Sequence, residues 1–184
     1  MMDYFSQAAL GSVIASLYAR TPGHDYRFRV RKMDNDANWC QWAYGRRFRV
    51  RAVQENDGAI SYSSGDDQQD GSAWSRTTRE GAYGKYVMTS TAGHNASATF
   101  AFYGRSVAVA TPRRTYLGKA RICLDPGTVR QSCSTLDLSP TDADLLGPRK
   151  LVWTRNGLNN SVRHRVTITT AAGRVDLDAI IVLR

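Results

Sequence analysis

Apolar and polar residues alternate with a period of two along most of this chain, in short runs separated by turn residues. No helical period is sustained between the runs. Regularly spaced short strands are typical of an all-β sandwich or barrel. The expected strands span residues 59–63, 85–89, 97–102, 106–110, 119–124, 134–138, 150–154, 163–169 and 175–183.

The last two runs indicate a hairpin that closes the fold. Both are rich in β-branched residues, and Gly173 lies in the short turn between them. Continued alternation through the final run predicts one apolar face made of Val175, Leu177, Ala179 and Ile181. Asp176 and Asp178 would lie on the other face, with Ile180, and we expect the two aspartates to serve the fold at a strand end.

Two earlier runs, residues 26–31 and 47–51, alternate strictly between apolar residues and arginine. Paired as a hairpin, they present an apolar face of Tyr26, Phe28, Val30, Phe48 and Val50. The opposite face is an arginine ladder of Arg27, Arg29, Arg31, Arg47, Arg49 and Arg51. Like charges directly opposite each other are destabilising, so solvent or an acidic partner must relieve them. A solvated face is the simpler interpretation of the ladder, and a polyanion-binding face is the alternative.

Composition narrows the classes of protein. The chain has 184 residues, 42% of them hydrophobic, and a net charge of +9 that comes from arginine. An arginine-rich surface can bind nucleic acid, acidic glycans, wall polymers or acidic lipids, but the residue usage of a GC-rich genome is the favoured explanation of the excess. No nucleic-acid motif is present, so we expect no specific nucleic-acid partner. No apolar run approaches the roughly 20 residues of a membrane span, and no signal peptide is visible.

Three cysteines bear on the compartment. Cys123 and Cys133 flank the turn residues Pro126-Gly127, so two strands joined by that loop could bring them within bridging range. We favour a disulfide there, which implies an oxidising compartment, and two buried thiols are the alternative. Cys40 is left over, either as a free thiol or as a link to a second chain.

Two parts of the chain resemble known modules. Residues 26–31, Asn38-Trp39 with Trp42, and residues 48–50 resemble the last strands of a fibronectin type III-like module. A later set of short motifs resembles a galactose-binding-like jelly roll: residues 59–63, Trp74, residues 98–100, 104–107 and 118–120 with Asp125, Gly157-Leu158, His164 and residues 176–179. Many secreted actinobacterial proteins end with this pair of modules.

The resemblance implies an order of domains. It divides the chain into a partial fibronectin type III-like unit at 1–54 and an antiparallel jelly-roll β-sandwich at 55–184. The first unit lacks half of its strands, so its apolar face needs a partner: residues 1–20, the jelly roll, or chain that a fragment would lack. Such jelly rolls often hold a structural calcium, and Asp176 and Asp178 could be drawn into that site. No other cofactor is expected.

The candidate ligand contacts are loop residues. Sugar sites combine an exposed aromatic face with nearby polar groups. Tyr83 and Tyr116 lie in turn-rich loops, and Arg113 and Arg114 precede Tyr116. No G-x-S-x-G elbow is present and the three histidines are dispersed, so we expect no enzyme activity.

The sequence therefore favours a non-catalytic binding or adhesion module of a secreted bacterial protein, outside the cell or at its surface, with a carbohydrate or cell-wall polymer as partner. A spacer domain of a larger secreted enzyme, without a ligand, is the alternative. Polyanion binding through the arginine ladder is the weaker alternative. Further partners would be a Cys40-linked second chain or the other domains of a parent protein.

Overall fold

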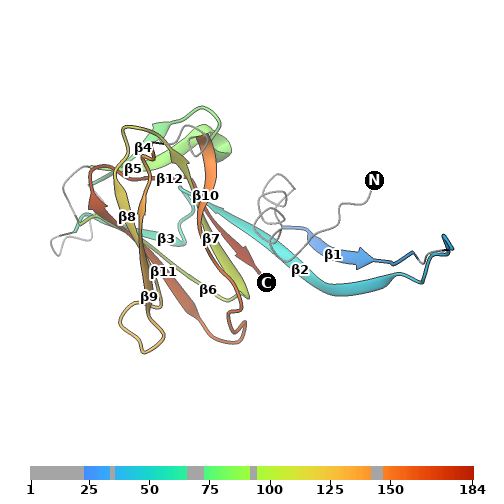
Figure 1. The fold of residues 1–184 in the computed structure, drawn as a ribbon. Helices are drawn as coiled ribbons and strands as arrows, with labels where there is room; N and C mark the ends of the chain where they lie inside the picture. Colours follow the sequence, from blue (N-terminus) through green and yellow to red (C-terminus); the bar gives the residue numbers. More distant parts are fainter. Residues whose placement is uncertain (1–22, 34–35, 66–72, 92–94, 142–146) are drawn as a thin grey trace.

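A computed structural model describes residues 23–33, 36–65, 73–91, 95–141 and 147–184. Its strands form two five-stranded antiparallel sheets and a small three-stranded sheet at one end (Figure 1). The first sheet has the order β1 (Asp25–Val30), β2 (Ala43–Gln54), β13 (Ala179–Leu183), β7 (Ser106–Arg113) and β10 (Gly147–Arg155). The second has the order β3 (Ile60–Ser63), β6 (Ser97–Phe102), β11 (His164–Ala172), β8 (Lys119–Leu124) and β9 (Ser132–Asp137). The small sheet contains β12 (Asp176–Leu177), β5 (Tyr86–Ser90) and β4 (Trp74–Thr78).

The two large sheets enclose the main core. Each inner face contributes alternate residues, as the period of two requires. Phe100 and Ile168 come from the second sheet, and Val109 and Ile180 from the first, and all four are at most 2% exposed. From β6 onward the chain crosses between sheets at almost every connection, which is the jelly-roll arrangement. The predicted all-β jelly-roll sandwich is confirmed. Among the described residues no helix is long and apolar enough to cross a bilayer.

The closing hairpin predicted from the sequence is wrong. β11 pairs with β6 and β8 in the second sheet, whereas β13 pairs with β2 and β7 in the first. The turn at Gly173 leads instead into β12, which joins the small sheet by pairing with β5. The chain therefore leaves the second sheet after β11. The final run then contributes β12 to the small sheet and β13 to the first sheet.

The predicted apolar face of that run is wrong as well. A break at Asp178, whose N–H donates to the carbonyl of Ala110, separates β12 from β13 and resets the alternation. Leu177 packs in the main core, as does Ile180. Ile181 packs in a second apolar cluster, made of Val50, Ala108, Ala110, Ala179 and Ile181.

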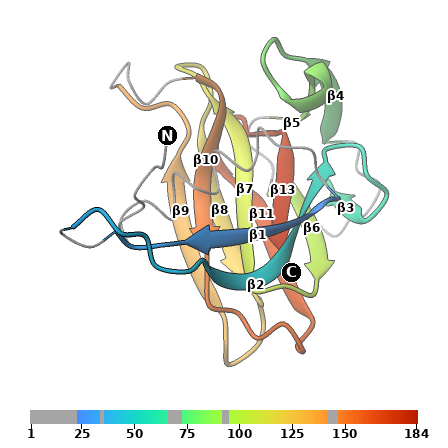
Figure 2. The ribbon, with the colours of Figure 1, turned by 90° about the vertical axis from the view of Figure 1, so that its right-hand side faces the viewer.

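An arm projects from one edge of the first sheet, where β1 and β2 extend beyond the sandwich (Figures 1 and 2). We define the arm as residues 25–49, that is β1, the following loop and the first part of β2. Residues 50–54 of β2 pair with β13, so the second half of this strand belongs to the sandwich. β2 thus joins the arm to the rest of the first sheet.

The domain boundary between residues 54 and 55 stays a prediction, and so does the fibronectin type III-like interpretation of residues 1–54. Residues 1–20, which could cover the apolar face of the arm, lie outside the described residues.

The arm has the two faces that the alternation predicts. Tyr26 and Phe28 both stack on Phe48, with ring centroids 5.9 and 5.0 Å away. The base of this apolar face packs on the second cluster, where Val50 is 3% exposed, so the jelly roll covers part of it. Phe28, farther out, remains 47% exposed.

The arginines of the two strands lie opposite one another less regularly than predicted. Arg27 pairs with Arg47 across the strands, but a register shift then places Tyr44 opposite Arg29. β2 also begins at Ala43, four residues earlier than expected, because the loop is shorter. Arg49 forms an exposed ion pair with Asp25 at 2.8 Å, and Arg51 lies 3.6 Å from Asp57.

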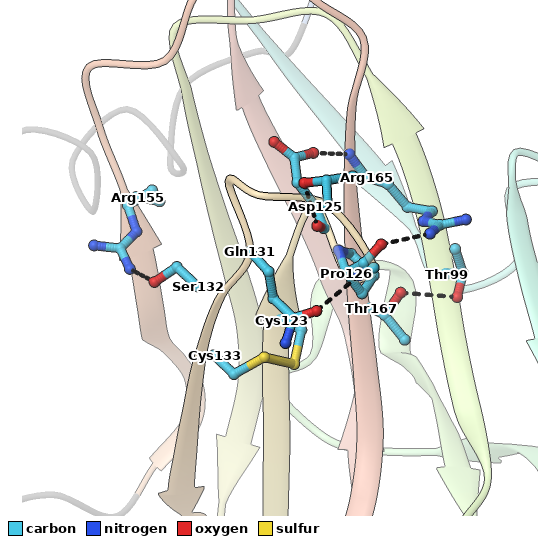
Figure 3. The surroundings of a disulfide bond; sticks show 12 residues. Thr99, Cys123, Asp125, Pro126, Gln131, Ser132, Cys133, Arg155, Arg165 and Thr167 are labelled. Carbon is cyan, nitrogen blue, oxygen red and sulfur yellow. Dashed lines mark hydrogen bonds between the residues drawn. A yellow bond between two sulfur atoms is a disulfide. The ribbon is translucent and has the colours of Figure 1, made fainter.

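The expected disulfide is present between Cys123 of β8 and Cys133 of β9 (Figure 3). The two residues are direct partners in the antiparallel ladder, with Cα atoms 4.1 Å apart. The bridge ties the edge strand β9 to its neighbour. Cys40 is an exposed free thiol whose Sγ accepts a hydrogen bond from the N–H of Lys32.

Candidate functional site

Three acidic side chains are buried near the end of the sandwich that carries the small sheet. Glu55, Asp176 and Asp178 are all at most 1% exposed. Each carboxylate has an arginine nearby: Arg76 lies 3.0 Å from Glu55, Arg79 lies 3.1 Å from Asp176, and Arg149 lies 3.9 Å from Asp178. A buried charge is tolerated only when it is paired, so these arginines are held where the carboxylates require them.

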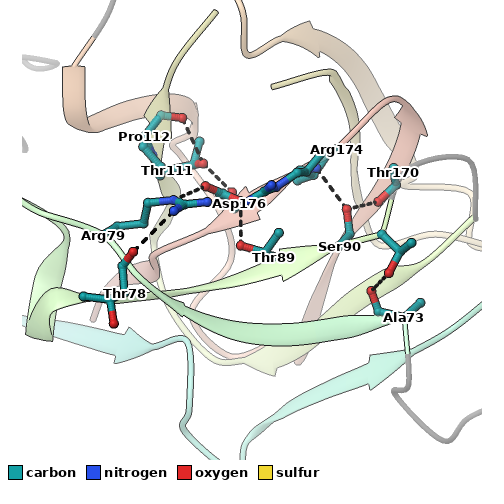
Figure 4. Close-up of polar contacts among 12 residues, drawn as sticks. Ala73, Thr78, Arg79, Thr89, Ser90, Thr111, Pro112, Thr170, Arg174 and Asp176 are labelled. Carbon is teal, nitrogen blue, oxygen red and sulfur yellow. Dashed lines mark hydrogen bonds and ion pairs between the residues drawn. The ribbon is translucent and has the colours of Figure 1, made fainter. Parts of the chain in front are cut away.

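Asp176 is the centre of the most complete of these arrangements (Figure 4). One carboxylate oxygen accepts a hydrogen bond from Nε of Arg79 at 3.1 Å, and the other accepts one from the hydroxyl of Thr89 at 2.7 Å. Nε of Arg174 lies 3.6 Å from the second oxygen. The hydroxyl of Thr111 donates to the backbone carbonyl of Asp176. One buried residue therefore positions two arginines at the surface.

The ring of Tyr116 lies near these two arginines. Its side chain is in the loop after β7 and the residue is 52% exposed. The guanidinium carbons of Arg79 and Arg174 each lie 5.6 Å from its ring centroid, within the range of a cation–π contact. An exposed aromatic ring is thus set beside guanidinium groups whose own position is fixed by Asp176.

Tyr83 is held in a similar way by Asp178, which lies two residues after Asp176 in the sequence. It lies in a 3₁₀ turn, Tyr83–Lys85, between β4 and β5. Its N–H donates to Asp178 at 2.9 Å, and the guanidinium carbon of Arg149 lies 5.7 Å from its ring. Tyr83 is half-buried, so Tyr116 is the more accessible of the two rings. The structure brings both predicted tyrosines to the segment from Asp176 to Asp178.

The two predicted arginines are placed differently. Arg113, the last residue of β7, donates through Nη2 to the carbonyl of Asp137 at 2.7 Å. The N–H of Arg114 donates to the carbonyl of Leu138. Both contacts lie at the end of β9. The arginines at the tyrosine rings are Arg79, Arg149 and Arg174, which the sequence analysis did not single out.

Calcium does not fit the two aspartates. A calcium ion takes six to eight oxygen ligands, and a guanidinium group beside a carboxylate opposes a second cation there. Asp176 and Asp178 are already paired with arginines. Among the described residues, no three His, Cys, Asp or Glu side chains come together as metal ligands.

His164 and Asp125 form a separate buried pair near the disulfide. Nδ1 of His164 lies 2.8 Å from the carboxylate of Asp125, and its Nε2 lies 3.1 Å from the carbonyl of Asn159. The N–H of Arg165 donates to the other carboxylate oxygen at 2.8 Å (Figure 3). The pair ties the loop after β8 to the start of β11, which is a structural role.

Asp125 makes stability depend on pH. Burial acts to raise the pKa of this carboxyl, but hydrogen bonds from His164 and Arg165 and the charges of His164 and Arg130 outweigh it and hold the pKa below its ordinary value. A lowered native pKa stabilises the fold above the unfolded-state pKa of about 3.9, and this contribution is lost as pH falls through the lower native value.

We therefore expect Asp125→Asn to lower the free energy of unfolding by about 1–3 kcal/mol near neutral pH, because hydrogen bonds to a charged acceptor are lost. Urea unfolding of both proteins across acidic pH checks the sign. The difference between them should shrink below about pH 4. A difference that is constant with pH would contradict the assigned role of the Asp125 charge.

No protein-family model matches the chain, and a search of curated proteins gives no significant match. Several solved structures are similar. A family two carbohydrate esterase from Cellvibrio japonicus aligns over 74% of this chain and 34% of its own, with 15% identity and a TM-score of 0.44. An exo-β-1,3-galactanase from Phanerochaete chrysosporium aligns over 77% of this chain and 30% of its own, with 14% identity and a TM-score of 0.46. TmCBM61 in complex with β-1,4-galactotriose aligns over 74% of this chain and 87% of its own, with 10% identity and a TM-score of 0.38. The chain spans about a third of the length of the esterase and the galactanase.

Proposed function

We propose that this chain is a non-catalytic carbohydrate-binding module whose ligand contacts Tyr116 and Tyr83. One observation carries the proposal. The exposed ring of Tyr116 lies against Arg79 and Arg174, and both arginines are anchored on the buried carboxylate of Asp176.

This arrangement supplies the two kinds of contact that a sugar needs. The C–H face of a sugar ring is apolar and packs on an aromatic ring, while its hydroxyl groups need hydrogen-bond partners. Guanidinium N–H groups beside Tyr116 can donate to those hydroxyls. Because Asp176 already fixes the two arginines, little side-chain entropy is lost when a ligand binds.

We propose further that the module belongs to a secreted bacterial protein. Its ligand would be a polymer of the cell surface or the cell wall. The disulfide between Cys123 and Cys133 supports an oxidising compartment. A fibronectin type III-like origin of residues 1–54 would fit such a secreted protein and belongs to the same proposal.

A glycan array probed with the full chain, followed by titration of the best ligand, tests the assignment. We expect Tyr116→Ala to weaken binding roughly ten-fold or more, because truncation of an anchoring aromatic residue costs at least about 1.4 kcal/mol. Tyr103→Ala is the matched control, since Tyr103 is 46% exposed and lies elsewhere on the sandwich. Its affinity should equal that of the unmodified chain.

Two results would overturn the proposal. If no neutral or acidic glycan binds, the chain is better explained as a spacer domain of a larger enzyme, without a ligand of its own. If Tyr103→Ala weakens binding as much as Tyr116→Ala, the ligand site lies elsewhere.

A further inference from the structure

The arm concentrates the positive charge of the chain. Between residues 25 and 49 there are seven basic and three acidic residues, so the arm carries +4 of the total net charge of +9. It projects away from the sandwich and most of its side chains are exposed (Figure 1). A charged element that is held away from the rest of the molecule is open to a long polymer along its length.

Three arginines of the arm lie over aromatic rings. The guanidinium carbon of Arg27 lies 4.5 Å from the ring centroid of Tyr44, and that of Arg29 lies 4.4 Å from Trp42. Arg31 lies 4.0 Å from Trp39 and 4.6 Å from Trp42. We call this set the Arg–aromatic face: Arg27, Arg29, Arg31, Trp39, Trp42 and Tyr44.

Stacking fixes the guanidinium planes without using most of their donors. A cation–π contact occupies the face of the guanidinium, while its N–H groups point outward in the plane. Nε of Arg27 donates to the carbonyl of Gly45. Within the described residues, carboxylates pair with Arg49 and Arg51, but none pairs with Arg27, Arg29 or Arg31. Nε of Arg31 is buried and has no hydrogen-bond partner there.

Arg27, Arg29 and Arg31 occupy alternate positions of the sequence. Alternate residues of a strand lie on one face and are about 6.6–6.8 Å apart along it. Arg27 and Arg29 lie on β1 and follow this pattern, and Arg31 comes one residue after β1 ends. The guanidinium groups of Arg29 and Arg31 both lie over the ring of Trp42, so the fork-shaped donors form a row on one face. A row of planar donors matches a row of sulfate or carboxylate groups, each of which accepts paired N–H bonds.

The aromatic rings of the arm are already covered by guanidinium groups, which favours an acidic polysaccharide over a nucleic acid as the ligand. Single-stranded nucleic acids are held mainly by bases stacked on free aromatic faces. Here the guanidinium groups already lie over the rings of Tyr44, Trp39 and Trp42. The disulfide also supports an oxidising compartment.

We propose that the Arg–aromatic face binds an acidic polysaccharide, whose sulfate or carboxylate groups accept hydrogen bonds from Arg27, Arg29 and Arg31. This site is separate from the site at Tyr116 and Tyr83, and it does not depend on the function proposed for that site.

Immobilised heparin, polygalacturonate and neutral dextran, with the full chain titrated at several salt concentrations, test this proposal. Binding to at least one of the two acidic polymers and not to dextran is expected. The triple variant R27Q/R29Q/R31Q should bind at least about ten-fold more weakly at low salt, and its log–log salt slope should fall by about 2–3, since three ionic contacts are lost. The matched control is K119Q/R121Q/R163Q, which removes three exposed charges from the sandwich and should keep most of the affinity.

A second variant, R27K/R29K/R31K, keeps the three positive charges but removes the planar guanidinium groups. It therefore tests whether the planar donors contribute to binding beyond electrostatic attraction. Lysine lacks the planar fork, so affinity for the acidic polymer should fall. Equal affinity of this variant, an equal loss in the control, or no binding to either acidic polymer would overturn the proposal. Tighter binding of a single-stranded oligonucleotide at the same salt would overturn the choice of polysaccharide. The variant Tyr116→Ala should leave binding at the arm unchanged, so the two sites can fail separately.

Discussion

Replacing Gly118 with alanine should lower the free energy of unfolding by about 3 kcal/mol or more. An added Cβ would lie 1.9 Å from the carbonyl oxygen of Ala172 and 2.8 Å from Cα of Gly173. Both are backbone atoms, so no side chain can rotate away, and the chain itself must move. Overpacking of side chains already costs about 1–3 kcal/mol, and a backbone obstacle belongs at the upper end of that range or beyond.

The displaced segment matters because Gly118 is bonded on both sides. Its N–H donates to the carbonyl of Arg174, and its carbonyl accepts from Leu138. Movement there would disturb the turn that leads to Asp176. Urea unfolding followed by circular dichroism measures the change, with an unchanged m-value as the sign of an intact two-state transition. Gly58→Ala is the control, since its added Cβ would meet nothing within 4 Å. An equal effect of the two substitutions would contradict the steric explanation.

Asp176→Ala should cost about 3–5 kcal/mol of unfolding free energy. It removes the partner of Arg79, whose side chain is only 21% exposed, and leaves the hydroxyl of Thr89 without its acceptor in the core. Breaking one side of a buried ion pair is strongly destabilising because the remaining charge is left poorly solvated. Thermal and urea unfolding would both report the loss.

The matched comparison is an exposed ion pair. Asp25 lies 2.8 Å from Arg49, but their side chains are 50% and 56% exposed. Asp25→Ala should therefore change stability by no more than about 1 kcal/mol. Asp176→Asn should fall between the two, since the amide can still accept from Thr89. If Asp176→Ala is as mild as Asp25→Ala, the buried pair does not stabilise the fold as argued.

Local patterns predicted individual strands well. The expected runs 97–102 and 119–124 coincide with β6 and β8, because each alternates clearly and is bounded by turn residues. The pairing of Cys123 with Cys133 could also be expected, since the two strands are joined by a short loop. β4 was not delimited, because Trp74–Thr78 is mostly polar and exposed and offers little alternation.

Long-range pairing could not be predicted in the same way. The segment after Gly173 looks like the second half of a hairpin, but it leaves its sheet because Asp176 and Asp178 need buried partners elsewhere. Arg79 is 97 residues from Asp176 in the sequence. A charged residue inside an apolar run signals that a partner exists, yet the identity of that partner depends on the folded topology.

The position of β13 has a consequence for how the chain folds. β13 lies between β2 and β7 in the first sheet, and it follows the other strands of both large sheets in the sequence. Until it emerges, the strands that flank it have no neighbour on that side and expose unpaired backbone groups. Contacts so distant in sequence are slow to form, so folding should be limited by the arrival and docking of residues 179–183. During this interval the open edges of β2 and β7 would be the places where a nascent chain associates with another copy or is held by a chaperone.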